Sequence, residues 1–280
     1  MRVEKEVLTS RQNPKVRYAA SLTEKKGRGE AHAFLAEGEK LTLDALASGM
    51  PITHIYAMES RRARLMERIF PVAEQERYRD TSWIWLSDDA FSKISTEKSP
   101  QGVVSVIKYL DFFKETDIIY KEDFFLAPEE RALALCGVRD PSNLGAVIRS
   151  AAAFGIDTVI LSGDCADIYS PKTVRAAMGS LFRVKVWTVS DFSSFVRVAR
   201  ASGRRVLSAE LSVAALPLGE AGLSGSDIVV IGNEGHGIPQ EISALCDAGL
   251  YIPITARAES LNASVAASVI LWEQSKDRVL

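Results

Sequence analysis

The stretch IPITARAESLNASVAA, residues 252–267, predicts a short buried strand, a polar turn and a long helix. Ser260 or Glu259 is suited to cap that helix, because either side chain can accept hydrogen bonds from the first N–H groups. The helix start offers free N–H donors, a hydroxyl and an amide beside a strand end, where open α/β sheets place ligands. We therefore predict a ligand site at this corner. The apolar side of the helix is expected to pack on the core through Leu261, Val265, Val269 and Trp272.

Length and composition indicate an ordinary folded protein. With 280 residues, of which 47% are hydrophobic and 25% charged, the chain can bury the cores of two domains. Residues 1–6 are too charged to begin a secretory signal, and no apolar run approaches the roughly 18 residues of a membrane span. Cys136, Cys165 and Cys246 are odd in number and far apart, which favours reduced thiols over disulfides or metal ligands. We expect a cytoplasmic protein without a metal or a membrane partner.

Positive charge is concentrated at the N-terminus, although the net charge of the chain is −2. Residues 1–28 contain eight Lys and Arg against three Asp and Glu, whereas residues 111–130 contain two against seven. Most charge runs are solvated helix faces, and a phosphate-binding arm is the alternative interpretation. Composition by itself favours the solvated face.

The order of apolar and amphipathic segments predicts two α/β domains joined by an acidic linker at residues 111–130. The first domain covers residues 1–110, with strands expected at 33–36, 52–58, 83–86 and 103–107. Its helices are expected at 14–22, closed by 25–28, and at 39–48 and 61–78. The second domain covers residues 131–280, with strands expected at 132–137, 158–161, 184–189, 205–209, 228–231 and 250–254. Helical patterns between these strands predict a parallel sheet covered on both faces.

One segment of the second domain combines a strong helix start with an isolated charge. Asp140 is an N-cap candidate, Pro141 occupies the first helical position, and Asn143 follows in the first turn. Arg149 is the only charge in the run 144–154, so a buried guanidinium here would need a carboxylate or a bound anion. Of these two partners, a carboxylate in a structural salt bridge is the commoner, and a bound anion is the alternative.

A second unusual segment, residues 228–239 (IVVIGNEGHGIP), runs from a buried strand into a loop with three glycines. Such a loop must turn tightly or let a ligand approach its backbone. The spacing Gly-x-x-Gly-x-Gly is not the dinucleotide fingerprint, so a nicotinamide-dependent dehydrogenase is weakly supported. Glu234 stands isolated among the glycines, whereas a lone loop histidine such as His236 is usually just exposed. Helix capping alone would explain Ser260 and Asn262. Taken together, however, the three segments that follow predicted strands offer an arginine, an acid, amides and a hydroxyl. This combination predicts an active site.

Together these segments resemble the three motifs of the SpoU (TrmH) family of RNA ribose methyltransferases, within the knotted SPOUT superfamily. The motifs correspond to residues 139–149 (RDPSNLGAVIR), 231–235 (IGNEG), and 252–254 with 259–262 and 264–266. Residues 170–182 (SPKTVRAAMGSLF) are also typical of the family. The N-terminal segments Asn13-Pro14, Lys25-Lys26 and Glu37-Gly38 are similar to its L30e-like substrate-binding domain. The resemblance therefore covers nearly the whole chain.

The resemblance implies a second domain with a deep trefoil knot, a rare exception among folds, that binds S-adenosylmethionine and works as a homodimer. It implies catalytic roles for Arg149, Asn143, Glu234, Ser260 and Asn262. The cofactor would be held by backbone groups around Gly232, Ile252 and Leu261. The strand end at residues 207–210, which are Leu207, Ser208, Ala209 and Glu210, would add to the pocket. Ala256 departs from the family, which more often has glycine there, so the turn is expected to differ.

The implied reaction is methylation of a ribose 2′-hydroxyl, in ribosomal RNA by preference and in transfer RNA as the alternative. RNA phosphates would then be contacted by Arg11, Lys15, Arg17, Lys25, Lys26 and Arg28. A guanidinium has a pKa above about 12, so Arg149 is better suited to bind a phosphate and stabilise an alkoxide than to act as a base. A non-catalytic RNA-binding protein would tolerate loss of the motif side chains, yet they are intact. No metal is required.

Overall fold

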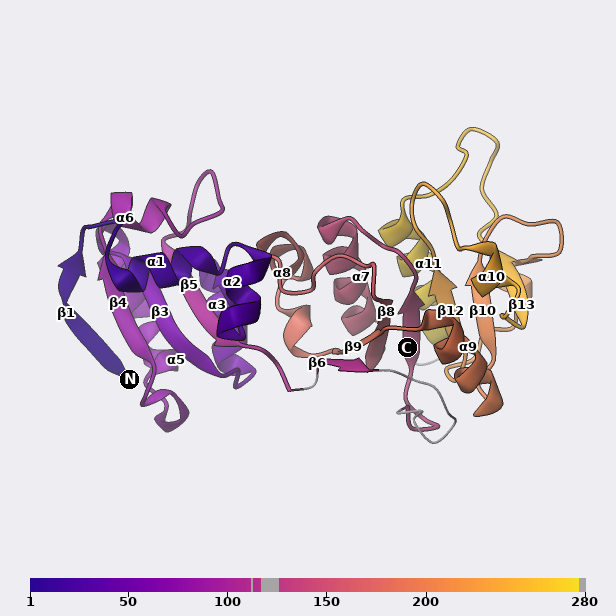
Figure 1. Ribbon diagram of the computed structural model, residues 1–280, viewed down its shortest axis with the longest axis horizontal. Helices are drawn as coiled ribbons and strands as arrows, with labels where there is room; N and C mark the ends of the chain where they lie inside the picture. Colours follow the sequence, from indigo (N-terminus) through magenta and orange to yellow (C-terminus); the bar gives the residue numbers. More distant parts are fainter. Residues whose placement is uncertain (112, 117–125, 277–280) are drawn as a thin grey trace. The chain divides into compact units, whose positions relative to one another are not determined.

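The structure, a computed structural model, describes residues 1–111, 113–116 and 126–276. These residues form two compact units (Figure 1). The first combines Met1–Asp111 with Asp167–Phe182, and the second contains the rest of the described chain. Sequence patterns placed the segment 167–182 in the second domain, but its helix α8 (Pro171–Ala177) packs against strand β2 (Ala33–Glu37) of the first unit.

The first unit contains a five-stranded mixed sheet in the order β1-β4-β3-β5-β2. Its remaining strands are β1 (Arg2–Leu8), β3 (Ile52–Met58), β4 (Ser82–Leu86) and β5 (Val103–Lys108). Strand β1 was not predicted, because its alternating charges read as a solvated terminus. It lies at the edge of the sheet, parallel to β4, where charged side chains are tolerated and discourage pairing with other chains.

The helices of the first unit are shorter than the sequence patterns suggested. They are α1 (Pro14–Ser21), α2 (Lys25–Ala31), α3 (Glu39–Ala47), α4 (Arg62–Arg68), α5 (Phe70–Ala73) and α6 (Asp88–Ser92). The single helix predicted over 61–78 is wrong, because Pro71 cannot continue a helix and starts α5 instead. Residues 25–28 begin a separate helix rather than closing the first.

The second unit contains an all-parallel sheet of eight strands within the described residues, as predicted for an α/β fold. Its order is β11-β13-β10-β12-β7-β8-β9-β6. The strands are β6 (Phe113–Thr116), β7 (Ala132–Leu135), β8 (Thr158–Ser162), β9 (Lys185–Val189), β10 (Val206–Ala209), β11 (Leu216–Pro217), β12 (Ile228–Ile231) and β13 (Ala248–Tyr251). Part of the predicted linker thus forms β6, which pairs with β9; residues 112 and 117–125 lie outside the described residues.

Helices cover the parallel sheet on both faces. One face packs against α9 (Phe192–Ala201) and α10 (Gln240–Ser243) through a cluster that includes Ile160, Phe195 and Val230. The other helices, α7 (Pro141–Ala153) and α11 (Ala263–Ser275), pack against each other, and α11 contacts β12. Ser150 and Ser268 approach to 2.7 Å between their hydroxyl oxygens, since small side chains let these two helices come close.

The start and the buried face of the final helix differ in part from the expectations. Of the three capping candidates, Glu259, Ser260 and Asn262, the N-cap is Asn262, whose Oδ1 accepts from the Ser264 N–H at 2.9 Å. Its buried side contains Ala267, Ile270 and Leu271, whereas Val265 and Trp272 are 47% and 44% exposed. Helical spacing groups residues on a face, but only the neighbouring elements decide which face is covered.

Candidate active site

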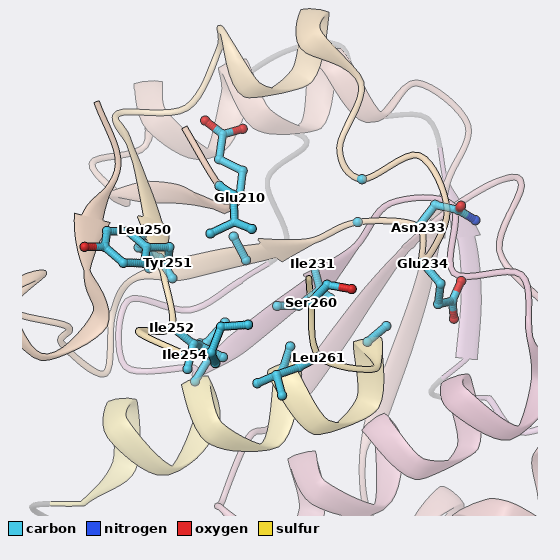
Figure 2. Close-up of a pocket in the computed structure, with 17 residues that line it drawn as sticks. Glu210, Ile231, Asn233, Glu234, Leu250, Tyr251, Ile252, Ile254, Ser260 and Leu261 are labelled. Carbon is cyan, nitrogen blue, oxygen red and sulfur yellow. The ribbon is translucent and has the colours of Figure 1, made fainter. Parts of the chain in front are cut away.

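A cavity of about 290 Å³ lies at the carboxyl ends of three adjacent parallel strands, β10, β12 and β13 (Figure 2). This volume is near the lower end for small-molecule sites, which span roughly 300–1,000 Å³. In Figure 2, Ile252, Ile254 and Leu261 group on one side of the cavity, and Asn233 and Glu234 lie on the other. The walls are mostly apolar: Ala209, Leu211, Ile231, Leu250, Tyr251, Ala263, Ala266 and Ile270 complete them, with Glu210, Gly232, Gly237 and Ser260.

The glycine loop after β12 is folded tightly against itself. A Cβ atom built on Gly232 would lie 2.4 Å from the carbonyl carbon of Gly237, closer than real Cβ contacts. Asn233 holds the loop: its Oδ1 accepts from the N–H groups of Gly235 at 2.9 Å and His236 at 3.1 Å. Its Nδ2 donates to the Gly137 carbonyl at 2.8 Å, which joins the loop to the end of β7. Glycine at 232 is therefore required by close approach of backbone.

Three predicted catalytic side chains meet at the rim of the cavity although they are far apart in sequence. Asn143 Nδ2 donates to Glu234 Oε1 at 2.5 Å, and Asn262 Nδ2 donates to Asn143 Oδ1 at 3.1 Å. Asn143 is in the first turn of α7, where Asp140 caps the helix by accepting from the N–H groups of Ser142 and Asn143. Two capped helix starts thus hold the amides, while the glycine loop holds the carboxylate.

Some of the other predicted site residues line the cavity, and others do not. Gly232, Ile252, Leu261, Ala209 and Ser260 line the cavity, as does Glu234. Leu207 and Ser208 do not, because they are buried within β10 before its carboxyl end. The strand end contributes Glu210, which the predicted segment 207–210 includes, and Leu211, which lies one residue beyond it.

Arg149 lies apart from this cluster. The expectation that Arg149 is buried and therefore needs a partner is wrong, because its side chain is exposed on α7. It follows Asn143 by six residues, which corresponds to about 9 Å along the helix and about 240° around it. Within one chain, Arg149 and the Asn143 side chain therefore point in different directions.

The basic N-terminal residues differ in what they can contact. Arg17, Lys25 and Lys26 are exposed, and Arg11 pairs with Asp89 at 3.7 Å at the surface. Lys15 is also exposed and pairs with Glu4. Arg28, however, is only 3% exposed: it pairs with Asp167 at 2.6 Å and donates to the carbonyls of Leu22 and Thr23. Its predicted contact with RNA is wrong, because the guanidinium is enclosed by the protein.

The remaining chemical expectations concern thiols, metals and membranes. Cys136, Cys165 and Cys246 are free thiols, and burial raises the pKa of Cys136 and of Cys246 to about 11. Among the described residues, no three His, Cys, Asp or Glu side chains converge on a point where a metal ion could bind. In the same part of the chain, no helix is long and apolar enough to cross a membrane.

A parallel sheet with a largely apolar cavity at its strand ends, and an amide–carboxylate–amide chain at the rim, defines an α/β enzyme that binds a small-molecule cofactor. The family model described as the SpoU rRNA Methylase family matches residues 130–272, and the model of the MRM3-like substrate binding domain matches residues 13–105. The chain belongs to the SpoU rRNA methylase family. The predicted family and the N-terminal substrate-binding domain are both confirmed.

The similarity to relatives and to solved structures covers nearly the whole chain. It is 31% identical over 265 residues to the 23S rRNA (guanosine(2553)-2′-O)-methyltransferase RlmP of Bacillus subtilis (strain 168), covering 95% of this chain and 97% of that one. The crystal structure of an rRNA methyltransferase from Sinorhizobium meliloti is 30% identical, with a TM-score of 0.82 and complete coverage of both chains. The AdoMet-bound structure of an rRNA methyltransferase from that organism is also 30% identical, with a TM-score of 0.79 and 99% coverage of both chains.

Proposed function

We propose that the protein transfers a methyl group from S-adenosylmethionine to a ribose 2′-hydroxyl of ribosomal RNA. The observation that carries the proposal is the chain of Asn143, Glu234 and Asn262, which brings the three predicted motifs together at the rim of one cavity. The named relatives, which are 23S rRNA 2′-O-methyltransferases or AdoMet-bound rRNA methyltransferases, support the same reaction.

The residues that line the cavity fit the chemistry of the cofactor. Its apolar walls suit an adenine ring and the carbon chain, and the strand ends and the glycine loop that line it carry the backbone groups proposed to make the polar contacts. We infer that backbone groups of Gly232, Ile252 and Leu261 hold the cofactor, with the Glu210 carboxylate beside them. When bound, S-adenosylmethionine supplies a methyl group attached to a positively charged sulfur.

The rim residues align the attacking hydroxyl. Glu234 and the two amides are exposed enough for a ribose to reach them, and their mutual hydrogen bonds fix their orientation before substrate arrives. Such preorganised polar groups lower the barrier by holding reactants close and correctly oriented. Ser260 adds a hydroxyl at the same wall. Arg149 would bind an RNA phosphate with its planar fork and stabilise the developing alkoxide.

We further infer that the protein is a homodimer in which the partner's Arg149 completes each site. Arg149 is exposed and turned away from the rim of its own chain, so a second copy is needed to bring a guanidinium there. The side chains of Val265 and Trp272 supply exposed apolar surface on α11, which packs beside α7. Burial of this surface in a two-fold interface would stabilise the dimer.

A trefoil knot is also part of the proposal. Strand β13 lies between β10 and β11, although both of these strands precede it in sequence. The chain must therefore insert between two earlier, connected strands before it forms the cavity wall at 252–261. This strand order supports a knotted path of the chain.

We also propose that the protein acts in the cytoplasm.

Calorimetry with S-adenosylmethionine and mapping of 2′-O-methylation in total RNA, with and without the gene, test the proposal. We expect cofactor binding and the loss of one or more methylated riboses in ribosomal RNA. Methylation lost only from transfer RNA would redirect the substrate. RNA binding without cofactor binding would identify a non-catalytic protein, and NAD binding instead would indicate a dehydrogenase.

Arg149→Lys is expected to lower kcat/KM about 100-fold while leaving cofactor affinity unchanged, since lysine keeps the charge but loses the bidentate fork. Mixing this variant with Asn143→Ala should restore about a quarter of wild-type activity in a shared-site dimer. Half of the dimers would then contain one copy of each variant. In such a dimer, one site combines an intact Asn143 with an intact Arg149 from the partner, and the other site carries both substitutions. Methyl transfer to RNA measures both results; unchanged turnover for Arg149→Lys, or no restoration on mixing, would contradict the assignment.

Arg17→Ala is expected to weaken RNA binding and to reduce the slope of log K against log salt by about 0.7–0.9, the effect of losing one phosphate contact. Arg79→Ala, an exposed arginine outside the basic segment, is the matched control and should leave the slope unchanged. Arg28→Ala should instead destabilise the fold by about 3 kcal/mol, because it removes a buried guanidinium that pairs with the half-buried Asp167 and donates to the carbonyls of Leu22 and Thr23. Equal slopes for Arg17→Ala and wild type would refute the phosphate contact.

A further inference from the structure

The first unit contains a second cavity, of about 220 Å³, far in sequence from the three motifs. It lies over α3 and the end of α8, and its walls combine charged and amide groups with apolar ones. The residues that line it are Glu37, Gly38, Lys40, Leu41, Asp44, Glu97, Ser99, Gln101, Arg175 and Met178. Arg175 and Met178 belong to the segment 170–182, for which the proposed methyl transfer has no use.

Two charged side chains in this cavity are available for a ligand. Lys40 and Asp44 are four residues apart on α3, so a cation and a carboxylate stand side by side on one helix face. Neither side chain forms an ion pair or hydrogen bond with any described residue. The other carboxylates are occupied: Glu37 accepts from Ser95 and Thr96, and Glu97 pairs with Arg175.

The backbone at the mouth of the cavity is strained. Met178 ends α8 in the left-handed region, with φ 50° and ψ 50°, a conformation that is uncommon for any residue but glycine, asparagine and aspartate. Its side chain is 42% exposed and lines the cavity. Gly179 follows at φ 78°, and a Cβ there would lie 2.4 Å from Asp44 Oδ2. This turn therefore places a thioether at the mouth, and glycine at position 179 leaves room for the Asp44 carboxylate.

We propose that this cavity binds an unpaired guanine of the RNA substrate. The Watson–Crick edge of guanine presents the O6 acceptor beside two adjacent donors, N1–H and N2–H, which match a cation beside a carboxylate. Lys40 donates to O6, Asp44 accepts from both donors, and the polarisable Met178 side chain packs on the face of the base. Adenine, cytosine and uracil each lack the pair of adjacent donors. The inference rests on the proposed function only in taking RNA as the ligand.

Fluorescence anisotropy with short labelled oligouridylates that carry one central guanosine, adenosine or inosine tests the proposal without any cofactor. We expect the guanosine oligonucleotide to bind about tenfold or more tightly than the adenosine one. Inosine, which lacks the N2 amino group, should lose much of this preference. Equal binding of the three oligonucleotides to the wild-type protein would overturn the proposal without any variant being needed.

Asp44→Asn supplies the complementary test on the protein. An amide replaces one of the two acceptors by a donor, which would face an N–H group of guanine, so the preference for guanosine should be lost. Lys40→Ala should weaken guanosine binding, whereas Lys93→Ala, an exposed lysine outside the cavity lining, should not. A retained guanosine preference in Asp44→Asn would refute the assignment. Calorimetry with S-adenosylmethionine on the same variants separates this result from failure of the proposed function.

Discussion

Replacing Gly232 with alanine is expected to lower the affinity for S-adenosylmethionine about 100-fold, equivalent to about 3 kcal/mol. The added methyl group would lie 2.4 Å from the Gly237 carbonyl carbon and 2.6 Å from the Ile238 nitrogen. Both neighbours are backbone atoms, so the whole loop must move to relieve the contact. Because the same loop forms one wall of the cavity and holds Glu234, the movement removes the cofactor surface.

Gly235→Ala is the matched control for this prediction. In the same loop, a Cβ on Gly235 would lie 3.5 Å from its nearest neighbour, Asn233 Oδ1, which is ordinary van der Waals contact. We expect this variant to bind the cofactor with nearly wild-type affinity. Calorimetry gives both dissociation constants, and thermal unfolding shows whether either variant is less stable. Similar affinity for Gly232→Ala and wild type would show that the cofactor does not use this wall.

Asn143→Ala is expected to lower kcat by about 10²–10³ while changing cofactor affinity little. Asn143 is the middle residue of the hydrogen-bonded series Glu234, Asn143 and Asn262. Alanine therefore removes both the amide that donates to Glu234 and the oxygen that accepts from Asn262. Without them, the carboxylate and the second amide lose the orientation that aligns the ribose. Single-turnover methylation with saturating cofactor measures the chemical step directly.

A double-mutant cycle with Glu234→Ala tests whether the rim residues act as one unit. We expect the double variant to be scarcely slower than either single variant, because each substitution already disrupts the same arrangement. The control is Asn13→Ala, which removes an asparagine that caps α1 in the first unit and should leave kcat unchanged. Additive losses in the cycle would indicate independent roles for Asn143 and Glu234.

The departure from the family at Ala256 has little structural consequence. Within the described residues, the left-handed non-glycine positions are His32 and Met178, so Ala256 has a backbone conformation that alanine adopts without strain. Its side chain is exposed in the turn before Ser260. The turn therefore tolerates alanine.

The sequence by itself determined the six inner strands of the parallel sheet and most of its helices, because long apolar runs alternate with clear helix starts. It did not predict the edge strands β6 and β11. Asp140 and Pro141 placed the start of α7 correctly, and the glycines of the 232–237 loop marked a tight backbone. These signals are local: capping, proline geometry and close approach act between residues near one another in the chain. For that reason they could be read without coordinates.

Only the tertiary structure decided which of these residues meet. Asn143 lies 91 residues before Glu234 and 119 before Asn262, and nothing in their local patterns sets the hydrogen bonds between them. The same holds for Arg28, which a charge count places at the surface and the fold buries against Asp167. Periodicity defines the faces of a helix or strand, but burial and pairing depend on the neighbours that the fold brings to each face.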